Sequence, residues 1–423
     1  MGKNSFHNHE MMVLDEDIVD EKEEIKNAHA AGLARAHTTS VIGNDNDFSF
    51  PITELPQRTF VPTKLTTRDF KGVEYIGNGS NSSIFTAFRG TEKFAVKMLK
   101  ENPKNLRVAE QELVLEAGIL ARLKHPNIIA INGVGEKIRK FIVLEYLEGG
   151  TMAQLLKGQK TNPPNGQIAA PKVAPILPLS NIINIALSLA SALRYIHEEV
   201  HPLATIIHRD LKPQNIGFSR DGVLKLFDFG LMTCVKRRTY STQAYLMTGY
   251  TGTVIYMAPE VALRQPYTEK VDIYSFGIIL WQMTSGQVPF AGMYQDEFMA
   301  KVVKEHHRPK IREDLPKQLI HLIECCWDND PQRRPSSSEL VEVLEALREA
   351  MIKKERELIH GGPTGFGSSL FRFMRGGSSN NMKVADDSNS YYNSNYNNSG
   401  SNSSSSSSIN HISTNNLSMF NRK

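Results

Sequence analysis

The spacing of hydrophobic and polar residues changes part-way along the chain. Up to about Leu147, short runs rich in β-branched and aromatic residues alternate with Gly, Asn and Glu turns, which is typical of strands. One stretch, Asn105–Lys124, repeats its apolar residues at helical spacing instead and predicts a helix. The predicted strands lie within the segments FKGVEYIG, SIFTAFRG, KFAVKMLK, IIAINGVG and KFIVLEYL.

From Met152 onward the apolar spacing is mainly helical. A sheet-rich part followed by a helix-rich part predicts an α+β unit with two lobes. We expect a small N-terminal lobe (about residues 60–144) with an antiparallel sheet and one main helix, and a larger helical lobe (about residues 148–358). The helices predicted for the larger lobe are Asn181–Glu199, Lys270–Gly286, Tyr294–Glu305, Pro316–Trp327 and Ser336–Glu357.

Three other segments lack this periodicity. Residues 158–178 are rich in proline and predict an inserted surface loop. Residues 1–59 are polar and predict a largely disordered arm, with room for a short helix around Asp17–Gly32. Residues 359–423 are dominated by Ser and Asn, a composition that cannot bury enough apolar surface to offset its chain entropy. We therefore predict a disordered tail there and one folded domain over residues 60–358.

Charge and cysteine usage narrow the class of protein. Lys and Arg exceed Asp and Glu by only 49 to 45, which gives no reason to expect a nucleic-acid partner. The three cysteines, Cys234, Cys325 and Cys326, have neither disulfide nor zinc spacing, which fits a reducing compartment. The apolar runs are too short to span a bilayer, and no secretory signal is recognised. We expect a cytoplasmic protein without a membrane span, and access to the nucleus stays open.

A glycine-rich turn, Gly77-Asn78-Gly79, joins two of the predicted strands and is flanked by Ile76 and Ile84. Because glycine has no Cβ, backbone N–H groups in such a turn can approach phosphate oxygens closely. An ordinary hairpin turn has the same composition, so this pattern alone does not decide the function.

Lys97 follows thirteen residues after Ile84 and lies inside an apolar predicted strand. An ammonium group is costly to bury there unless it is paired. Glu116, on the predicted helix Asn105–Lys124, is the candidate partner. Each residue alone fits a solvated surface charge equally well, but together they predict an ion pair that presents an ammonium group to phosphate.

Two later segments carry the decisive chemistry: HRDLKPQN at residues 208–215 and DFG at residues 228–230. Asp210 provides a carboxylate that accepts a proton from a hydroxyl, and Lys212 a charge for a transferring phosphoryl group. Asn215 and Asp228 provide oxygen ligands of the kind that Mg²⁺ prefers. Phosphoryl transfer needs little from a protein beyond positioning and charge neutralisation.

With these motifs in this order, residues Thr59–Leu358 resemble the eukaryotic protein kinase family. The resemblance implies ATP and Mg²⁺ as cofactors in a cleft between the lobes, protein substrates, and transfer of the γ-phosphate. It implies catalytic roles for Asp210, Lys212, Lys97 and Glu116, and metal binding by Asn215 and Asp228. The residues that it assigns to the nucleotide are Ile76, Gly77, Asn78, Gly79, Ile84, Ala95, Lys97, Glu145 and Leu147.

The resemblance extends into the larger lobe and to the substrate class. It implies that Glu260 pairs with Arg334, that Asp272 braces the catalytic loop, and that Thr253 bonds near Asp210. Lys212, two residues after the base, is typical of serine/threonine kinases, while CWDNDPQRRPSSSELVEVL resembles their tyrosine-kinase-like group. Dual specificity remains an alternative.

Arg209 is placed to bind a phosphate on the activation segment, Asp228–Glu260, which implies an upstream kinase as a partner. Position favours Thr248 or Thr251 as the modified residue, and spacing does not choose between them.

Two residues depart from the family pattern. Ser82 replaces the third glycine of the loop, and Gly217 stands where the family has a leucine-like floor under adenine. The glycine removes an apolar contact, so a pseudokinase scaffold is the main alternative to an active enzyme, unless neighbouring side chains fill the gap.

Overall fold

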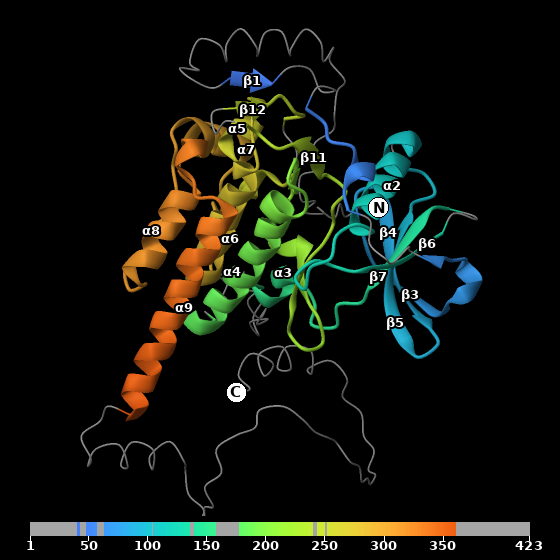
Figure 1. The fold of residues 1–423 in the computed structure, drawn as a ribbon, viewed down its shortest axis with the longest axis horizontal. Coiled ribbons are helices and arrows are strands. Elements are labelled where there is room, and N and C mark those ends of the chain that lie inside the picture. Colours follow the sequence, from blue (N-terminus) through green and yellow to red (C-terminus); the bar gives the residue numbers. More distant parts are fainter. Residues whose placement is uncertain are drawn as a thin grey trace, which may run out of the picture.

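The computed structural model describes residues 40–42, 48–56, 63–103, 105–135, 139–157, 177–239, 243–249 and 252–360. Figure 1 shows a lobe made of the sheet and α2 beside a larger lobe of helices. The predicted α+β class with two lobes is therefore confirmed. The predicted helix at Asp17–Gly32, most of the 158–178 insert and the tail beyond residue 360 lie outside the described residues.

The smaller lobe is one six-stranded sheet with the order β2-β6-β7-β5-β4-β3. All neighbouring strands are antiparallel except the edge strand β2, which is parallel to β6. Its helix α2 (Leu106–Leu120) begins at Asn105, whose side chain accepts a hydrogen bond from the Val108 N–H. The strands are β2 (Thr63–Lys64), β3 (Lys71–Asn78), β4 (Ser82–Arg89), β5 (Glu92–Leu99), β6 (Ile131–Gly135) and β7 (Phe141–Glu145).

Helix α6 (Lys270–Ser285) lies at the centre of the larger lobe, and its residues 271–285 are all buried. It packs against α4 and α8, while α4 and α8 also pack against α9. All five helices predicted for this lobe are present. The remaining helices are α3 (Met152–Leu155), α4 (Leu179–Arg194, continued as a π-helix over Tyr195–Glu199), α5 (Pro259–Ala262), α7 (Gln295–Glu297, continued as a π-helix over Phe298–Lys304), α8 (Lys317–Cys326) and α9 (Ser337–His360).

Three pairs of short strands lie in the larger lobe, and loops of the candidate site adjoin them. β8 (Ala204–Ile207) pairs antiparallel with β11 (Thr233–Lys236). β9 (Ile216–Phe218) pairs antiparallel with β10 (Leu224–Leu226). β12 (Gln243–Tyr245) pairs in parallel with β1 (Ser40–Ile42). Single-turn 3₁₀ helices occur at Ile52–Glu54, Thr67–Asp69, Pro213–Asn215, Val254–Tyr256 and Pro331–Arg333.

The stretch Leu179–Glu199 is long and apolar enough to cross a membrane by length and composition. Half of its most apolar window is buried inside the lobe, and α4 packs against α6 and α9. Core packing within this domain therefore accounts for its apolar character.

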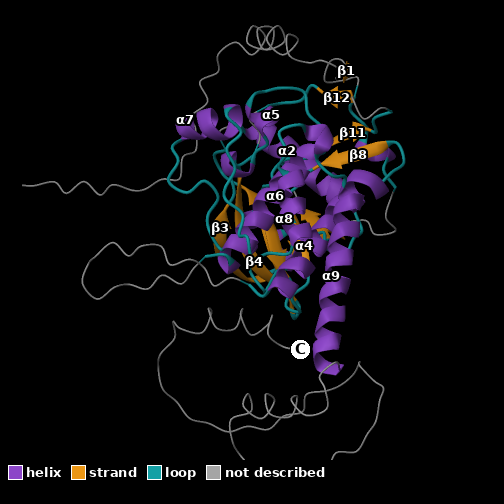
Figure 2. Cartoon of the chain, turned by 90° about the vertical axis from the view of Figure 1, so that its left-hand side faces the viewer, coloured by secondary structure: helices purple, strands orange, loops and turns teal. Residues whose placement is uncertain are grey.

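Residues 48–50, which we assigned to a disordered arm, pair antiparallel with β11 of the larger lobe through an isolated bridge between Ser49 and Val235. The Phe50 N–H donates to Cys234 O (3.0 Å), and Phe48 O accepts from the Lys236 N–H (2.8 Å). This segment therefore lies along β11, on the side opposite β8. Figure 2 shows β8, β11, β12 and β1 together at one end of the molecule.

The same segment is anchored by apolar side chains. Phe48, Phe50 and Leu55 are all buried. The Phe48 ring lies 5.4 Å from that of Tyr245, and the Phe50 ring 4.9 Å from that of His201. The predicted domain start at residue 60 is therefore too late, because residues 48–55 pack as part of the domain. The alternation of Phe48, Phe50 and Ile52 is short and is interrupted by Pro51, so we did not assign a strand there.

Replacing Phe48 or Phe50 by alanine is expected to lower the free energy of unfolding by about 1–3 kcal/mol. This is less than the ~3–5 kcal/mol for a fully enclosed phenylalanine, because the segment can detach while the lobe stays folded. Urea denaturation measures the change. Glu54→Ala, on an exposed position of the same segment, is the control. Phe48→Ala and Phe50→Ala proteins as stable as this control would contradict the packing.

Candidate active site

The glycine-rich loop connects β3 to β4 and is closed by a hydrogen bond from the Gly79 N–H to Ser82 O (2.7 Å). A Cβ added at Gly77 would meet nothing within 4 Å, so open space lies over this part of the loop. The Asn81 amide donates to Glu112 Oε2 on α2 (2.9 Å), a link between loop and helix that the motifs did not indicate.

Lys97 of β5 contacts two carboxylates. Its Nζ lies 2.7 Å from Glu116 Oε2 on α2 and 2.6 Å from Asp228 Oδ1, which follows β10. The predicted Lys97–Glu116 pair is confirmed. Asp228 adds a partner from the larger lobe, so one ammonium group links both lobes.

Burial and charge oppose each other in this cluster. Burial disfavours the charged lysine, but Glu116 and Asp228 outweigh it and raise the Lys97 pKa. Burial raises the pKa of Glu116 against the opposing effect of Lys97. For Asp228 burial acts to raise the pKa, but the Lys97 ammonium, together with smaller effects of His208 and Lys212, outweighs it and lowers the pKa. One cation thus faces two carboxylates, and the cluster retains negative charge when both are ionised.

The catalytic loop holds the Asp210 carboxylate with neighbouring donors. Lys212 Nζ donates to Asp210 Oδ2 (2.7 Å) and to Thr253 Oγ1 (2.9 Å). The Asn215 amide donates to Asp210 O (2.9 Å) and Oδ2 (3.0 Å). The Thr253 N–H donates to Asp210 Oδ1 (3.1 Å), which confirms the predicted contact. Gly252 has φ +101°, and a Cβ there would lie 2.6 Å from Arg209 O.

Asp272 of α6 fixes the backbone of this loop. Its buried carboxylate accepts hydrogen bonds from the N–H groups of His208 (2.8 Å) and Arg209 (2.9 Å). Arg209 has φ 66°, a left-handed conformation that costs free energy in a non-glycine residue. The two hydrogen bonds that this buried carboxylate accepts stabilise the conformation, so the predicted bracing role of Asp272 is confirmed.

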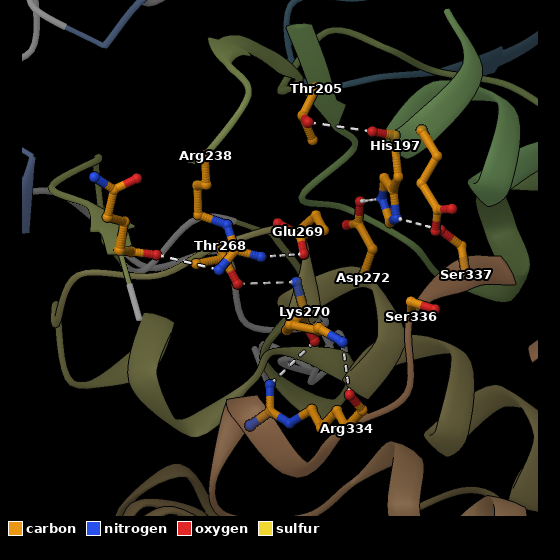
Figure 3. Close-up of polar contacts among 12 residues, drawn as sticks. His197, Thr205, Arg238, Thr268, Glu269, Lys270, Asp272, Arg334, Ser336 and Ser337 are labelled. Atoms are coloured by element: carbon orange, nitrogen blue, oxygen red, sulfur yellow. Dashed lines mark hydrogen bonds and ion pairs between the residues drawn. The ribbon is translucent and has the colours of Figure 1, made fainter. Parts of the chain in front are cut away.

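Figure 3 shows how Asp272 is itself held. His197 lies between Asp272 Oδ2 (2.9 Å from Nε2) and Ser337 Oγ at the start of α9 (3.2 Å from Nδ1). Burial acts to raise the Asp272 pKa, but hydrogen bonding and charge from His197 prevail and lower it. The carboxylate therefore stays ionised as an acceptor for the catalytic loop.

A second buried ion pair connects the end of the activation segment to Arg334 of the larger lobe. Arg334 Nη1 and Nη2 lie 2.6 and 2.9 Å from Glu260 Oε1 and Oε2. Lys270 Nζ, at the start of α6, donates to Arg334 O (2.6 Å), as Figure 3 shows. The predicted Glu260–Arg334 pair is confirmed, in bidentate form.

Several of the residues expected around adenine are neighbours in the sheet of the smaller lobe. Ala95 and Leu144 are cross-strand neighbours on β5 and β7, and Ile84 of β4 pairs with Lys97. Glu145 Oε1 accepts from the Ala130 N–H (2.7 Å) and pairs with Lys225. The Glu145 side chain is therefore engaged within the protein.

Backbone groups that follow β7 suit adenine better than the Glu145 side chain does. The Leu147 C=O accepts from the Gly150 N–H (3.2 Å). The Leu147 N–H makes no hydrogen bond to the part of the chain that the structure describes. An N–H group at this position can recognise a ring nitrogen. Ile76 and Asn78 lie on β3 before the loop, and the Ile76 side chain is 52% exposed.

Asn215 and Asp228 are suited to a hard cation. Asn215 turns its NH₂ group to Asp210, which leaves its carbonyl oxygen for a ligand. Asp228 Oδ2 lies beside the Oδ1 that contacts Lys97, on a side chain that is 40% exposed. The described residues contain no cluster of three or more His, Cys, Asp or Glu side chains that could hold a metal ion. Two oxygen ligands plus phosphates are the usual environment of Mg²⁺, so the residues fit Mg·ATP.

A glycine-rich loop next to a paired lysine, facing a carboxylate held by lysine and asparagine, is the arrangement of a phosphoryl-transfer site between two lobes. The chain belongs to the protein kinase family: the family model, described as protein kinase domain, matches residues 70–344.

Similarity to individual kinases covers about the same part of the chain. The chain is 36% identical to the serine/threonine-protein kinase VIK of Arabidopsis thaliana over 288 residues. This match spans 67% of this chain and 61% of VIK. The chain is 32% identical to the serine/threonine/tyrosine-protein kinase HT1 of the same plant, over 66% of this chain and 67% of HT1. The dual specificity protein kinase shkE of Dictyostelium discoideum is 31% identical, over 68% of this chain and 38% of shkE. These matches agree with the predicted likeness to the tyrosine-kinase-like group.

Replacing Glu260 by glutamine is expected to lower the free energy of unfolding by about 3 kcal/mol, because it leaves the buried Arg334 guanidinium without its counter-charge. Urea denaturation at neutral pH measures the loss. The matched control is Glu313→Gln, whose partner Lys310 and own side chain are 85% and 83% exposed, and it should leave the unfolding midpoint unchanged. Equal losses in both variants would contradict the structural role of the buried pair.

Proposed function

We propose that this chain is a protein serine/threonine kinase that transfers the γ-phosphate of Mg·ATP to hydroxyl groups of protein substrates. The observation that carries the proposal is Lys97 Nζ in contact with both Glu116 and Asp228. This contact couples the smaller lobe to the metal-binding carboxylate and so assembles the phosphate site. The intact pair also favours an active enzyme over a pseudokinase scaffold.

Each residue has a role that its contacts support. Asp210 orients the substrate hydroxyl and accepts its proton, because Lys212, Asn215 and Thr253 hold both carboxylate oxygens in place. Lys212 and Lys97 place positive charge where phosphoryl charge develops. Asn215 and Asp228 hold Mg²⁺. When bound, Mg·ATP supplies the phosphoryl group, and the metal neutralises part of its charge.

The contact between Lys212 and Thr253, which places a threonine beside the base, supports serine/threonine specificity. Among the similar proteins, VIK is named a serine/threonine kinase, whereas HT1 and shkE are named for wider specificity. Dual specificity is therefore the second candidate, and analysis of the phosphorylated residue type in a substrate mixture distinguishes the two.

Asp210→Asn is expected to lower kcat by about 10²-fold or more, since it removes the proton acceptor while keeping the side-chain size. Transfer of labelled γ-phosphate to a generic protein substrate measures it. Asp221→Asn, at an exposed carboxylate in the β9–β10 turn, is the matched control and should retain full activity. A folded wild-type protein that transfers no phosphate, including after treatment with an activating kinase, would favour the scaffold.

We further propose that an upstream kinase acts on Thr248. Arg209 Nη1 lies 3.0 Å from Thr248 Oγ1 and 3.2 Å from the Tyr267 hydroxyl. A phosphate on Thr248 would meet this guanidinium next to the catalytic base. The other candidate, Thr251, lies outside the described residues.

Phosphatase treatment is expected to lower the activity of the phosphorylated wild type by about tenfold, as the loss of a few charge-assisted contacts implies. Thr248→Ala should have this lower activity before treatment and lose nothing further. Thr239→Ala, at an exposed threonine of the same segment, should behave as wild type. Undiminished activity of Thr248→Ala would exclude Thr248 as the controlling residue.

A further inference from the structure

Gly217 occupies the middle of β9, and the backbone conformation does not require a glycine there. It pairs with Lys225 of β10 on one side and forms a bridge to Thr151 on the other. Its φ lies outside the left-handed region that favours glycine. The reason for a glycine at this position must therefore lie in the space around it.

That space is already filled by two other side chains. A Cβ added at Gly217 would lie 2.5 Å from Leu147 Cδ1, 3.2 Å from Phe227 Cε1 and 3.3 Å from the backbone oxygen of Gly150. The adjacent side chains of β9, Ile216 and Phe218, are buried on the opposite face of the strand. Leu147 and Phe227 thus reach the point that a side chain at position 217 would occupy.

Contacts of its backbone N–H and C=O groups hold Phe227 in position. The Phe227 N–H donates to Asn215 O (3.0 Å), and its C=O lies 3.2 Å from His208 Nε2. The next residue, Asp228, is held by Lys97. Phe227 therefore extends from the residues that surround the metal site toward Leu147, which follows β7. Both side chains are only half-buried, so apolar surface remains for a ligand.

We propose that Phe227 and Leu147 form the floor of the adenine site, and that the Phe227 ring replaces the side chain that Gly217 lacks. The inference rests on the proposed binding of Mg·ATP. An aromatic ring offers a flat face on which a nucleotide base can stack. A larger residue at 217 must displace Leu147, whose Cδ1 is the nearest atom, and a smaller residue at 227 leaves the space into which Leu147 can move. Positions 217 and 227 are then linked through Leu147.

Mg·ADP affinity, measured by titration calorimetry, tests the link with four proteins: wild type, Phe227→Ala, Gly217→Leu and the double variant. Phe227→Ala is expected to weaken binding by about tenfold through the loss of stacking. Gly217→Leu should weaken it at least as much, because the new side chain displaces Leu147 and Phe227. The double variant should recover to within about threefold of wild type, since the new leucine and the displaced Leu147 side chain can then occupy the space that the ring vacates.

Further variants separate this role from a loss of folding. Phe227→Leu keeps most of the apolar volume and should weaken binding by only about threefold. Phe88→Ala removes a partly exposed ring on β4 and should bind Mg·ADP as wild type does. At saturating ATP, kcat of the Phe227 variants should change less than KM for ATP, because the floor binds the base and leaves the reacting groups in place.

The outcomes are distinguishable. Wild-type affinity in both Phe227→Ala and Phe227→Leu would overturn the proposed floor while leaving nucleotide binding intact. Additive losses in the double variant would overturn the link between positions 217 and 227. A folded wild type that does not bind Mg·ADP would overturn the proposed function, and the floor with it.

Discussion

The ammonium group of Lys97 holds carboxylates from both lobes, and the geometry of the site depends on this contact. Burying an ion costs several kcal/mol unless its charge is matched, so Lys97 makes Glu116 and Asp228 converge. Convergence requires α2 to lie against β5, and it requires Asp228 to adopt a left-handed φ of 65°. Two carboxylates on one ammonium leave a negative charge, which a divalent cation is suited to balance.

The larger lobe acts as the rigid support for this arrangement. Asp272, on the fully enclosed α6, holds the backbone of the catalytic loop, and His197 connects it to the start of α9. The activation segment is held on two sides, since β11 pairs with β8 and also with residues 48–50. Phe48 contacts Tyr245, and the Tyr245 N–H in turn bonds to Tyr267 O. A contact path therefore runs from the N-terminal segment toward Arg209 and Thr248.

The parts of the fold that short stretches of sequence determine could be predicted from the sequence. The strands and long helices have the period of their own secondary structure, and Lys97, Glu116 and Asp210 lie in motifs that phosphoryl transfer requires. Features that depend on distant parts of the chain could not be predicted in this way. The alternation in FSFPITEL spans only three apolar residues and contains a proline, so its packing was not apparent. The Asn81–Glu112 contact and the meeting of Leu147 with Phe227 are products of tertiary structure alone.

The departure from the family pattern at Gly217 has a physical explanation. Charged groups at the site must sit at set distances from phosphate oxygens, because hydrogen bonds and ion pairs are directional and short-ranged. Apolar contact with a base is less demanding, since it depends on area and volume more than on the atom that supplies them. The charged and amide residues of this site therefore match the family's motifs, while Leu147 and Phe227 fill the space beside Gly217. A glycine at position 217 is thus compatible with the proposed nucleotide binding, because these two side chains supply apolar surface at the same place.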